Sequence, residues 1–155
     1  MKEKLQEYAF IAEIVGAIAV VVSLLYVGSS VKQNTNALLT SNHQALIAMD
    51  ISKNDWLKDP EFTAITVIAD EDINRLNPVQ IRQYTVYVAN IFNAWEFAYI
   101  SHQNGMMDEN MWAGWDGFYS NTLKNTKGYQ WFWMNDRENF TPEFRRYADS
   151  ILDDI

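Results

Sequence analysis

Apolar residues form one nearly unbroken run between Tyr8 and Val31, close to the start of the chain. The run carries one charge, on Glu13, and one serine, Ser23, before it becomes polar at Gly28-Ser29-Ser30. A helix over this run is about 36 Å long at 1.5 Å per residue, and the hydrocarbon core of a bilayer is roughly 30 Å thick. The pattern therefore predicts a single transmembrane helix, which with its short leader makes up residues 1–31.

A cleaved signal peptide is the alternative interpretation of this run. Lys2 and Lys4 fit a basic leader, and Val27-Gly28-Ser29 fits a weak cleavage site. Signal peptides, however, have an apolar core of about 7–15 residues. Because this run is longer and contains Glu13, the comparison favours a retained anchor, with the lipid bilayer as a partner.

Small residues recur along one face of the predicted span, at steps of three, four or seven residues. They are Ala9, Ala12, Gly16, Ala19, Ser23 and Ser30. Small side chains let two helices pack closely in lipid, so this face predicts a helix–helix interface, in a homo-oligomer or with other membrane proteins. The alternative is that Ala and Gly are simply frequent in transmembrane helices.

Glu13 is the one ionisable residue of the span, and burying a charge in lipid is costly. Three interpretations stay open. Its carboxylate extends to the headgroups, or accepts a hydrogen bond from a neighbouring helix, for example from Tyr8, or handles ions or protons in an assembled pore.

Each of the three prolines follows a residue that can cap a helix. The pairs are Asp59-Pro60, Asn77-Pro78 and Thr141-Pro142. A capping side chain followed by proline is typical of a helix start, because proline lacks the N–H that the first turn leaves unpaired. Gln80 completes a capping-box pattern with Asn77, and Asp108 offers a fourth start.

Apolar residues recur at helical spacing through most of the chain after the span. The clearest stripe predicts a helix of about 25 residues from Pro78 to Asn104-Gly105. Its members are Ile81, Tyr84, Val88, Ile91, Trp95, Ala98 and His102. Further helices are expected over 31–57, from Pro60, over 109–124, over 129–140, and from Pro142 along a stripe that ends at Ile155. The prediction is an all-α fold in which residues 32–155 form a domain of about five helices.

The predicted domain is acidic and has no cysteine. The net charge is −8, and residues 33–155 carry 17 Asp and Glu against 9 Lys and Arg. An acidic domain repels phosphate backbones, so no nucleic-acid partner is expected. Without cysteine there are no disulfides and no thiolate ligands or nucleophiles.

No motif for catalysis, a cofactor or a metal is present. The two histidines, His43 and His102, lack a Glu-x-x-His partner pattern, and a packed or hydrogen-bonded role is expected for His102. The acidic stretch 70–74 resembles the start of a calcium loop, but Arg75 and Ile81 stand where that loop needs Gly and Glu. The sequence therefore predicts a non-enzymatic protein without cofactors.

Six tryptophans are spread over the predicted domain. They are Trp56, Trp95, Trp112, Trp115, Trp131 and Trp133. Aromatic residues at helical spacing are most often core. Contact with a partner or with the membrane surface, and a small-molecule pocket, are the alternatives, and the last five tryptophans are the candidate residues.

Five segments give the chain a resemblance to a known group. They are Glu13–Val27, Gln33-Asn34-Thr35, Phe92–Tyr99, Gly105–Trp112 and Phe140–Phe144. In these the chain resembles a group of small, uncharacterised bacterial single-pass membrane proteins with an N-terminal anchor and a helical domain. The resemblance implies a bacterial inner-membrane location with the domain in the cytoplasm, and the group has no known activity to carry over to this chain. Lysine counts beside the span, with Lys2 and Lys4 before it and Lys32 after it, favour the opposite orientation.

Three functional hypotheses follow. The first is a membrane-anchored assembly or accessory protein that self-associates or docks to a larger membrane complex through the small-residue face. The second is a homo-oligomeric channel with Glu13 near its axis. The third is a ligand sensor or enzyme with an aromatic pocket.

Overall fold

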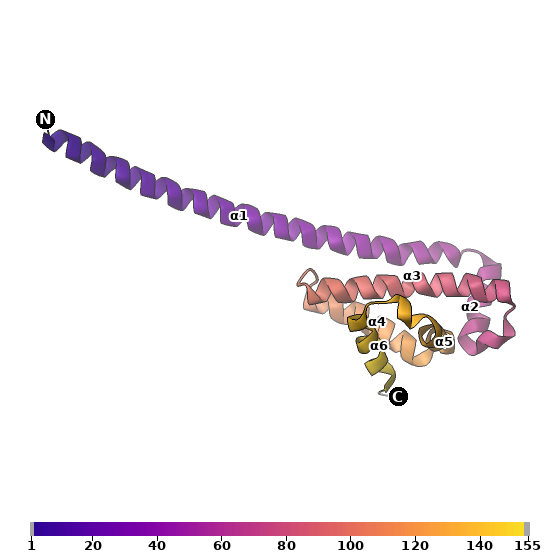
Figure 1. Ribbon diagram of the computed structural model, residues 1–155. Helices are drawn as coiled ribbons and strands as arrows, with labels where there is room; N and C mark the ends of the chain where they lie inside the picture. The colour runs from indigo at the N-terminus through magenta and orange to yellow at the C-terminus, as the bar shows by residue number, and fades with distance from the viewer. Residues whose placement is uncertain (1, 154–155) are drawn as a thin grey trace. The chain divides into compact units, whose positions relative to one another are not determined.

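The computed structural model describes residues 2–153, apart from the side chains of Glu3 and Glu7; Ile155 of the last predicted stripe lies outside this range (Figure 1). The elements in chain order are α1 (Lys2–Trp56), α2 (Pro60–Asp72), η1 (Ile73–Arg75), α3 (Pro78–Gln103), α4 (Glu109–Asn125), α5 (Lys127–Asp136), η2 (Arg137–Asn139) and α6 (Pro142–Asp153). No strand occurs in the described part of the chain, so the all-α prediction is confirmed.

The chain divides into two compact units, an N-terminal unit (Met1–Thr40) and a C-terminal unit (Ser41–Ile155). The division falls later than the predicted boundary at Val31. Residues 33–36 are polar and exposed, and Leu38 is also exposed. Compact packing therefore begins only in the last part of α1.

The N-terminal unit consists of the first part of α1. This helix is long and apolar enough to cross a membrane: an 18-residue window has a mean hydropathy of 2.5, and none of that window is buried. The hydroxyls of Ser23 and Thr35 donate to the carbonyls of Ala19 and Val31, at 2.8 and 3.0 Å. These polar side chains are therefore satisfied within their own helix.

Helix starts in the C-terminal unit follow the predicted cap chemistry. Asp59 accepts a hydrogen bond from the Glu61 N–H at 2.9 Å, and Asp108 accepts one from the Asn110 N–H at 2.9 Å. Asn77 forms the full capping box with Gln80. The predicted starts near Pro60, Pro78 and Glu109 are confirmed, and α6 likewise begins at Pro142.

The long helix α3 ends near Asn104-Gly105, as the sequence predicted. Asn104 is its C-cap, and Gly105 follows with a φ of 67°. Glycine adopts this left-handed conformation without the steric penalty that a side chain would bring. The chain can therefore turn sharply from α3 towards α4.

The largest side chains in the core of the C-terminal unit are aromatic. Phe92 of α3 packs on Phe132 and Trp133 of α5, with ring centroids 5.2 Å away in both cases. Trp95 stacks on Tyr119 of α4 at 5.6 Å and meets Phe144 of α6 edge-on at 5.3 Å. One helix, α3, thus holds α4, α5 and α6 around a shared core.

The last part of α1 belongs to this unit and packs by a second, smaller cluster. Leu46 is fully buried against Ala98 of α3 and Met107 of the α3–α4 loop. Further along, Trp56 contacts Phe62 edge-on at 5.3 Å. These contacts fix which face of residues 41–56 is turned inward.

Candidate functional site

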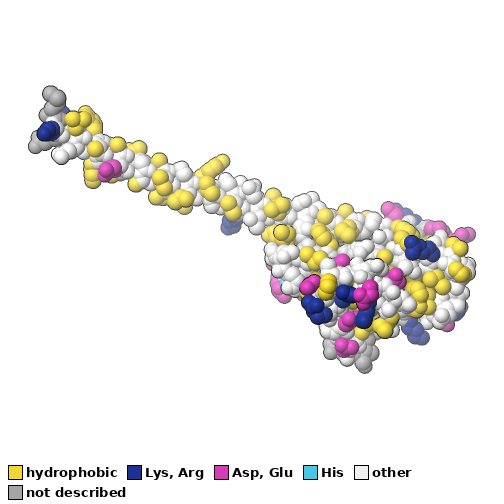
Figure 2. All heavy atoms as spheres, in the orientation of Figure 1, with side chains coloured by type: hydrophobic (Ala, Val, Ile, Leu, Met, Phe, Trp, Pro, Cys, Tyr) yellow, Lys and Arg dark blue, Asp and Glu magenta, His cyan; other side chains and the backbone are white. Residues whose placement is uncertain are grey.

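Six residues of the N-terminal unit were predicted to form a helix–helix interface. They are Ala9, Ala12, Glu13, Gly16, Ala19 and Ser23. All of them are exposed on α1, and a Cβ added at Gly16 would meet nothing within 4 Å. Figure 2 shows apolar side chains exposed along the visible face of this helix. The interface stays a prediction, since the structure describes a single chain.

The five candidate tryptophans separate into two groups by burial. Trp95 and Trp133 are at most 1% exposed and lie in the core, where the Trp133 indole N–H donates to Asp149 at 2.7 Å. Trp112, Trp115 and Trp131 are half-buried and pack against the core from its edge. Only the second group presents aromatic surface to a partner or ligand.

His102 lies at the edge of the unit, near the end of α3. Its ring stacks on Trp112 at 5.0 Å, and its Nε2 is 2.9 Å from a carboxylate oxygen of Glu109. This agrees with the expected packed, hydrogen-bonded role. Among residues 2–153 no group of His, Asp and Glu is arranged to hold a metal ion.

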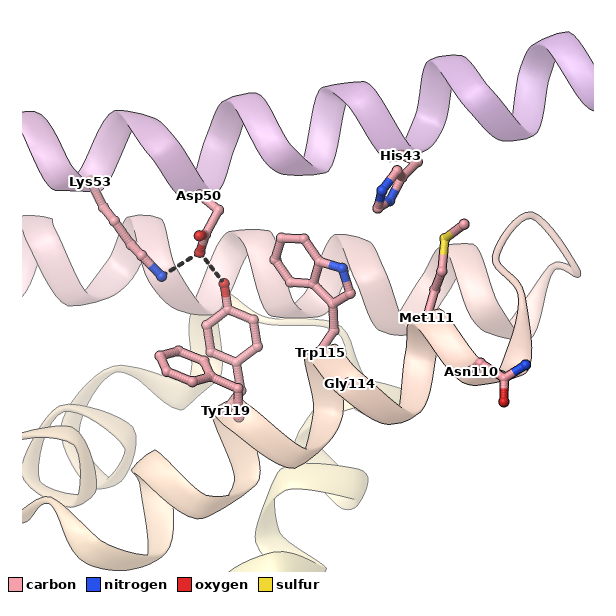
Figure 3. A pocket seen from close by; sticks show the side chains of 9 residues that line it. His43, Asp50, Lys53, Asn110, Met111, Gly114, Trp115 and Tyr119 are labelled. Carbon is pink, nitrogen blue, oxygen red and sulfur yellow. Dashed lines mark hydrogen bonds and ion pairs between the residues drawn. The ribbon is translucent and has the colours of Figure 1, made fainter.

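A groove opens between the last part of α1 and helix α4, and we call it the α1–α4 groove (Figure 3). It encloses about 380 Å³. Its lining residues are His43, Asp50, Lys53, Asn110, Met111, Gly114, Trp115, Phe118 and Tyr119. Figure 3 shows His43 at one end of the groove and the side chains of Asp50 and Lys53 at the other.

An ion pair and a phenol form the polar end of the groove. Oδ1 of Asp50 pairs with the Lys53 ammonium and also accepts a hydrogen bond from the Tyr119 hydroxyl, at 3.0 Å. The ammonium lies over the rings of Phe118 and Tyr119, 5.1 and 5.4 Å from their centroids. Cation–π attraction and the ion pair together hold Lys53 in place.

Burial controls the protonation of the Tyr119 hydroxyl. Burial raises the pKa of Tyr119 well above its ordinary value, and the nearby Asp50 carboxylate raises it further. Burial in the same way raises the pKa of Tyr84 and of Tyr129. Tyr119 therefore acts at neutral pH as a hydrogen-bond donor to Asp50.

The sequence identified Trp115 as a candidate contact residue, but it did not predict this groove. Its walls come from segments far apart in the chain, and helical spacing alone does not say which faces meet. One signal was available: Leu46, Asp50 and Lys53 follow one another at steps of four and three, which places them on one helix face.

Comparisons with protein families, with curated proteins and with solved structures found no match for this chain. The fold and its sites define the class on their own: an all-α protein with one helix long and apolar enough to cross a membrane, and a helical unit with an open groove.

Proposed function

We propose that this chain is a membrane-anchored, non-enzymatic assembly or accessory protein of a bacterial inner membrane. Its transmembrane helix carries the small-residue face, through which it self-associates or docks to a larger membrane complex. The helical C-terminal unit lies in the cytoplasm, as the resemblance to small bacterial membrane proteins implies.

The observation that carries this proposal is the exposure of the apolar part of α1. A core helix of a soluble protein would bury its apolar window, whereas here none of the window is buried. Burying a Val, Leu or Ile side chain is worth roughly 1.5–3 kcal/mol. Leaving this whole segment in water would therefore forgo on the order of tens of kcal/mol of favourable burial. A bilayer removes this cost.

The small-residue face supplies the association surface. Gly16 leaves open space where a side chain would stand, so a second backbone can approach closely. The Ser23 hydroxyl is already bonded to Ala19 of its own helix. Close packing, rather than a hydroxyl hydrogen bond, is therefore the interaction expected at this face.

Substitution of Gly16 tests the proposal. In detergent, the chain or its complex is expected to lose its associated mass in Gly16→Ile, measured by size-exclusion chromatography with light scattering. Ala17→Ile is the matched control, because it adds similar bulk about a third of a turn away from the face. An associated mass that is unchanged in Gly16→Ile refutes the role of this face.

A further inference from the structure

Helix α4 carries two interior glycines that the fold does not require. Gly114 and Gly117 both have ordinary helical backbone angles, and a Cβ at either would meet nothing within 4 Å. Glycine inside a helix costs roughly 0.5–1 kcal/mol relative to alanine. Gly114 lines the α1–α4 groove and Gly117 does not. A side chain at position 114 would therefore occupy open space that now belongs to the groove.

The walls of the groove are mostly apolar and partly open to solvent. Met111 and Phe118 are 42% and 57% exposed, on either side of the half-buried Trp115. Such a lining suits the aromatic ring of a ligand, since aromatic faces and methionine sulfur both make favourable contacts with aromatic groups.

The size of the groove fits a small molecule. Its volume of about 380 Å³ lies within the range of small-molecule sites, roughly 300–1,000 Å³.

The polar end of the groove offers one hydrogen-bond acceptor and no net charge. Asp50 Oδ1 receives both the Lys53 and the Tyr119 hydrogen bonds. Its Oδ2 receives none from the described residues and is not a buried atom, and the Asp50 side chain is 34% exposed. Because Lys53 neutralises Asp50, a charged group at this end of the groove would lose its hydration without gaining a free counter-charge.

The geometry points to a binding site for a small, uncharged aromatic molecule with a hydrogen-bond donor, of the chemical class of indoles and phenols. Its ring lies over Gly114 and against Trp115, and its N–H or O–H donates to Oδ2 of Asp50. This inference concerns the C-terminal unit and holds independently of the proposed role of the transmembrane helix.

Indole is the first probe, titrated into the full-length chain in detergent micelles. The signal is the indole N–H resonance of Trp115 in a ¹⁵N spectrum, identified by its loss in Trp115→Phe. A saturable shift of this resonance is expected. Tryptamine and indole-3-acetate carry the same ring with a positive or a negative charge, and both are expected to bind at least tenfold more weakly.

Two glycine variants separate binding from folding. Gly114→Leu places a side chain in the groove, and its Cβ meets nothing within 4 Å. It is therefore expected to keep the helical circular-dichroism spectrum and to lose at least tenfold in indole affinity. Gly117→Leu makes the same change in open space outside the groove, and its affinity is expected to stay within twofold. It also controls for partition of indole into the micelle.

Three results would overturn the inference. The Trp115 resonance does not shift saturably with indole, or Gly114→Leu binds indole as well as the unmodified chain does. Tighter binding of tryptamine or of indole-3-acetate than of indole would show that the ligand class is wrong.

Discussion

The hydroxyl of Tyr84 in α3 donates a 2.7 Å hydrogen bond to a carboxylate oxygen of Asp70 near the end of α2. Tyr84 is fully buried, and Gly128 of α5 lies directly against its hydroxyl and against the Ala69 carbonyl. Three helices thus meet at one polar contact at the edge of the core, where Tyr84 is buried and Asp70 is open to solvent. The close approach of α5 at this point depends on the missing side chain of Gly128.

Gly128→Ala is expected to destabilise the C-terminal unit. The added Cβ would stand 2.2 Å from the Tyr84 oxygen and 2.8 Å from the Ala69 carbonyl oxygen, and the latter is backbone that cannot rotate away. Forcing a methyl group into packed surroundings costs about 1–3 kcal/mol. The measurement is the free energy of unfolding by denaturant. Gly117→Ala is the control: its Cβ meets open space, so it is expected to stabilise by roughly 0.5–1 kcal/mol. Equal effects of the two changes would contradict this packing.

Asp70 is expected to make the stability depend on pH. Burial raises the pKa of Asp70 above its ordinary 3.8, and the hydrogen bond from Tyr84 offsets part of this rise. The folded state then holds the proton more tightly than the unfolded state, so the contribution of Asp70 to stability falls as pH rises from 3.8 through the raised pKa.

Asp70→Asn should remove this contribution, because asparagine accepts the Tyr84 hydrogen bond without a charge to desolvate. The measurement is the free energy of unfolding of both proteins at a series of pH values from 3 to 7. The difference between them is expected to move in favour of the Asn variant as pH rises. A difference that is constant with pH would show that Asp70 is not perturbed.

Local chemistry explains why much of the fold could be predicted. The side chains of Asp59, Asn77 and Asp108 each accept hydrogen bonds from backbone N–H groups two or three residues later. A few consecutive residues therefore determine where each helix starts. The stripe from Ile81 to His102 likewise needs only helical periodicity to predict α3.

Packing between distant segments could not be predicted in this way. Trp95 and Trp115 both lie on helical stripes, yet the first is in the core and the second lines the groove. Their difference depends on how α4 crosses α3 and on which face of residues 41–56 of α1 is turned towards α4. Asp50 and Tyr119 meet across a sequence separation of 69 residues, for which no spacing rule exists.

Glu96→Ala is expected to loosen the start of α6. One oxygen of Glu96 in α3 accepts hydrogen bonds from the Thr141 N–H at 2.7 Å and from the Thr141 hydroxyl at 2.8 Å, immediately before the helix begins at Pro142. Removing both bonds should cost about 1–2 kcal/mol, in the range of a lost helix cap. The measurement is the free energy of unfolding, together with amide hydrogen exchange of residues 143–145.

Glu96→Gln is the matched control, since its amide oxygen can still accept both bonds. It is expected to retain most of the stability and the exchange protection. If the amide hydrogens in the first turn of α6 exchange equally fast in both variants, the hydrogen bonds from Thr141 to Glu96 do not stabilise the start of this helix.

The absence of cysteine makes the orientation in the membrane directly measurable. Single cysteines at Gln6 and Gln103 are both at exposed positions, before the apolar run and near the end of α3. Neither substitution alters the lysine counts beside the span. With a membrane-impermeant maleimide on spheroplasts, Gln6→Cys is expected to be labelled and Gln103→Cys to be protected until the membrane is permeabilised, because we place the C-terminal unit in the cytoplasm. The reverse pattern would show that Lys2 and Lys4 set the orientation, as the positive-inside rule predicts. Labelling of both positions before permeabilisation would contradict a membrane-spanning helix.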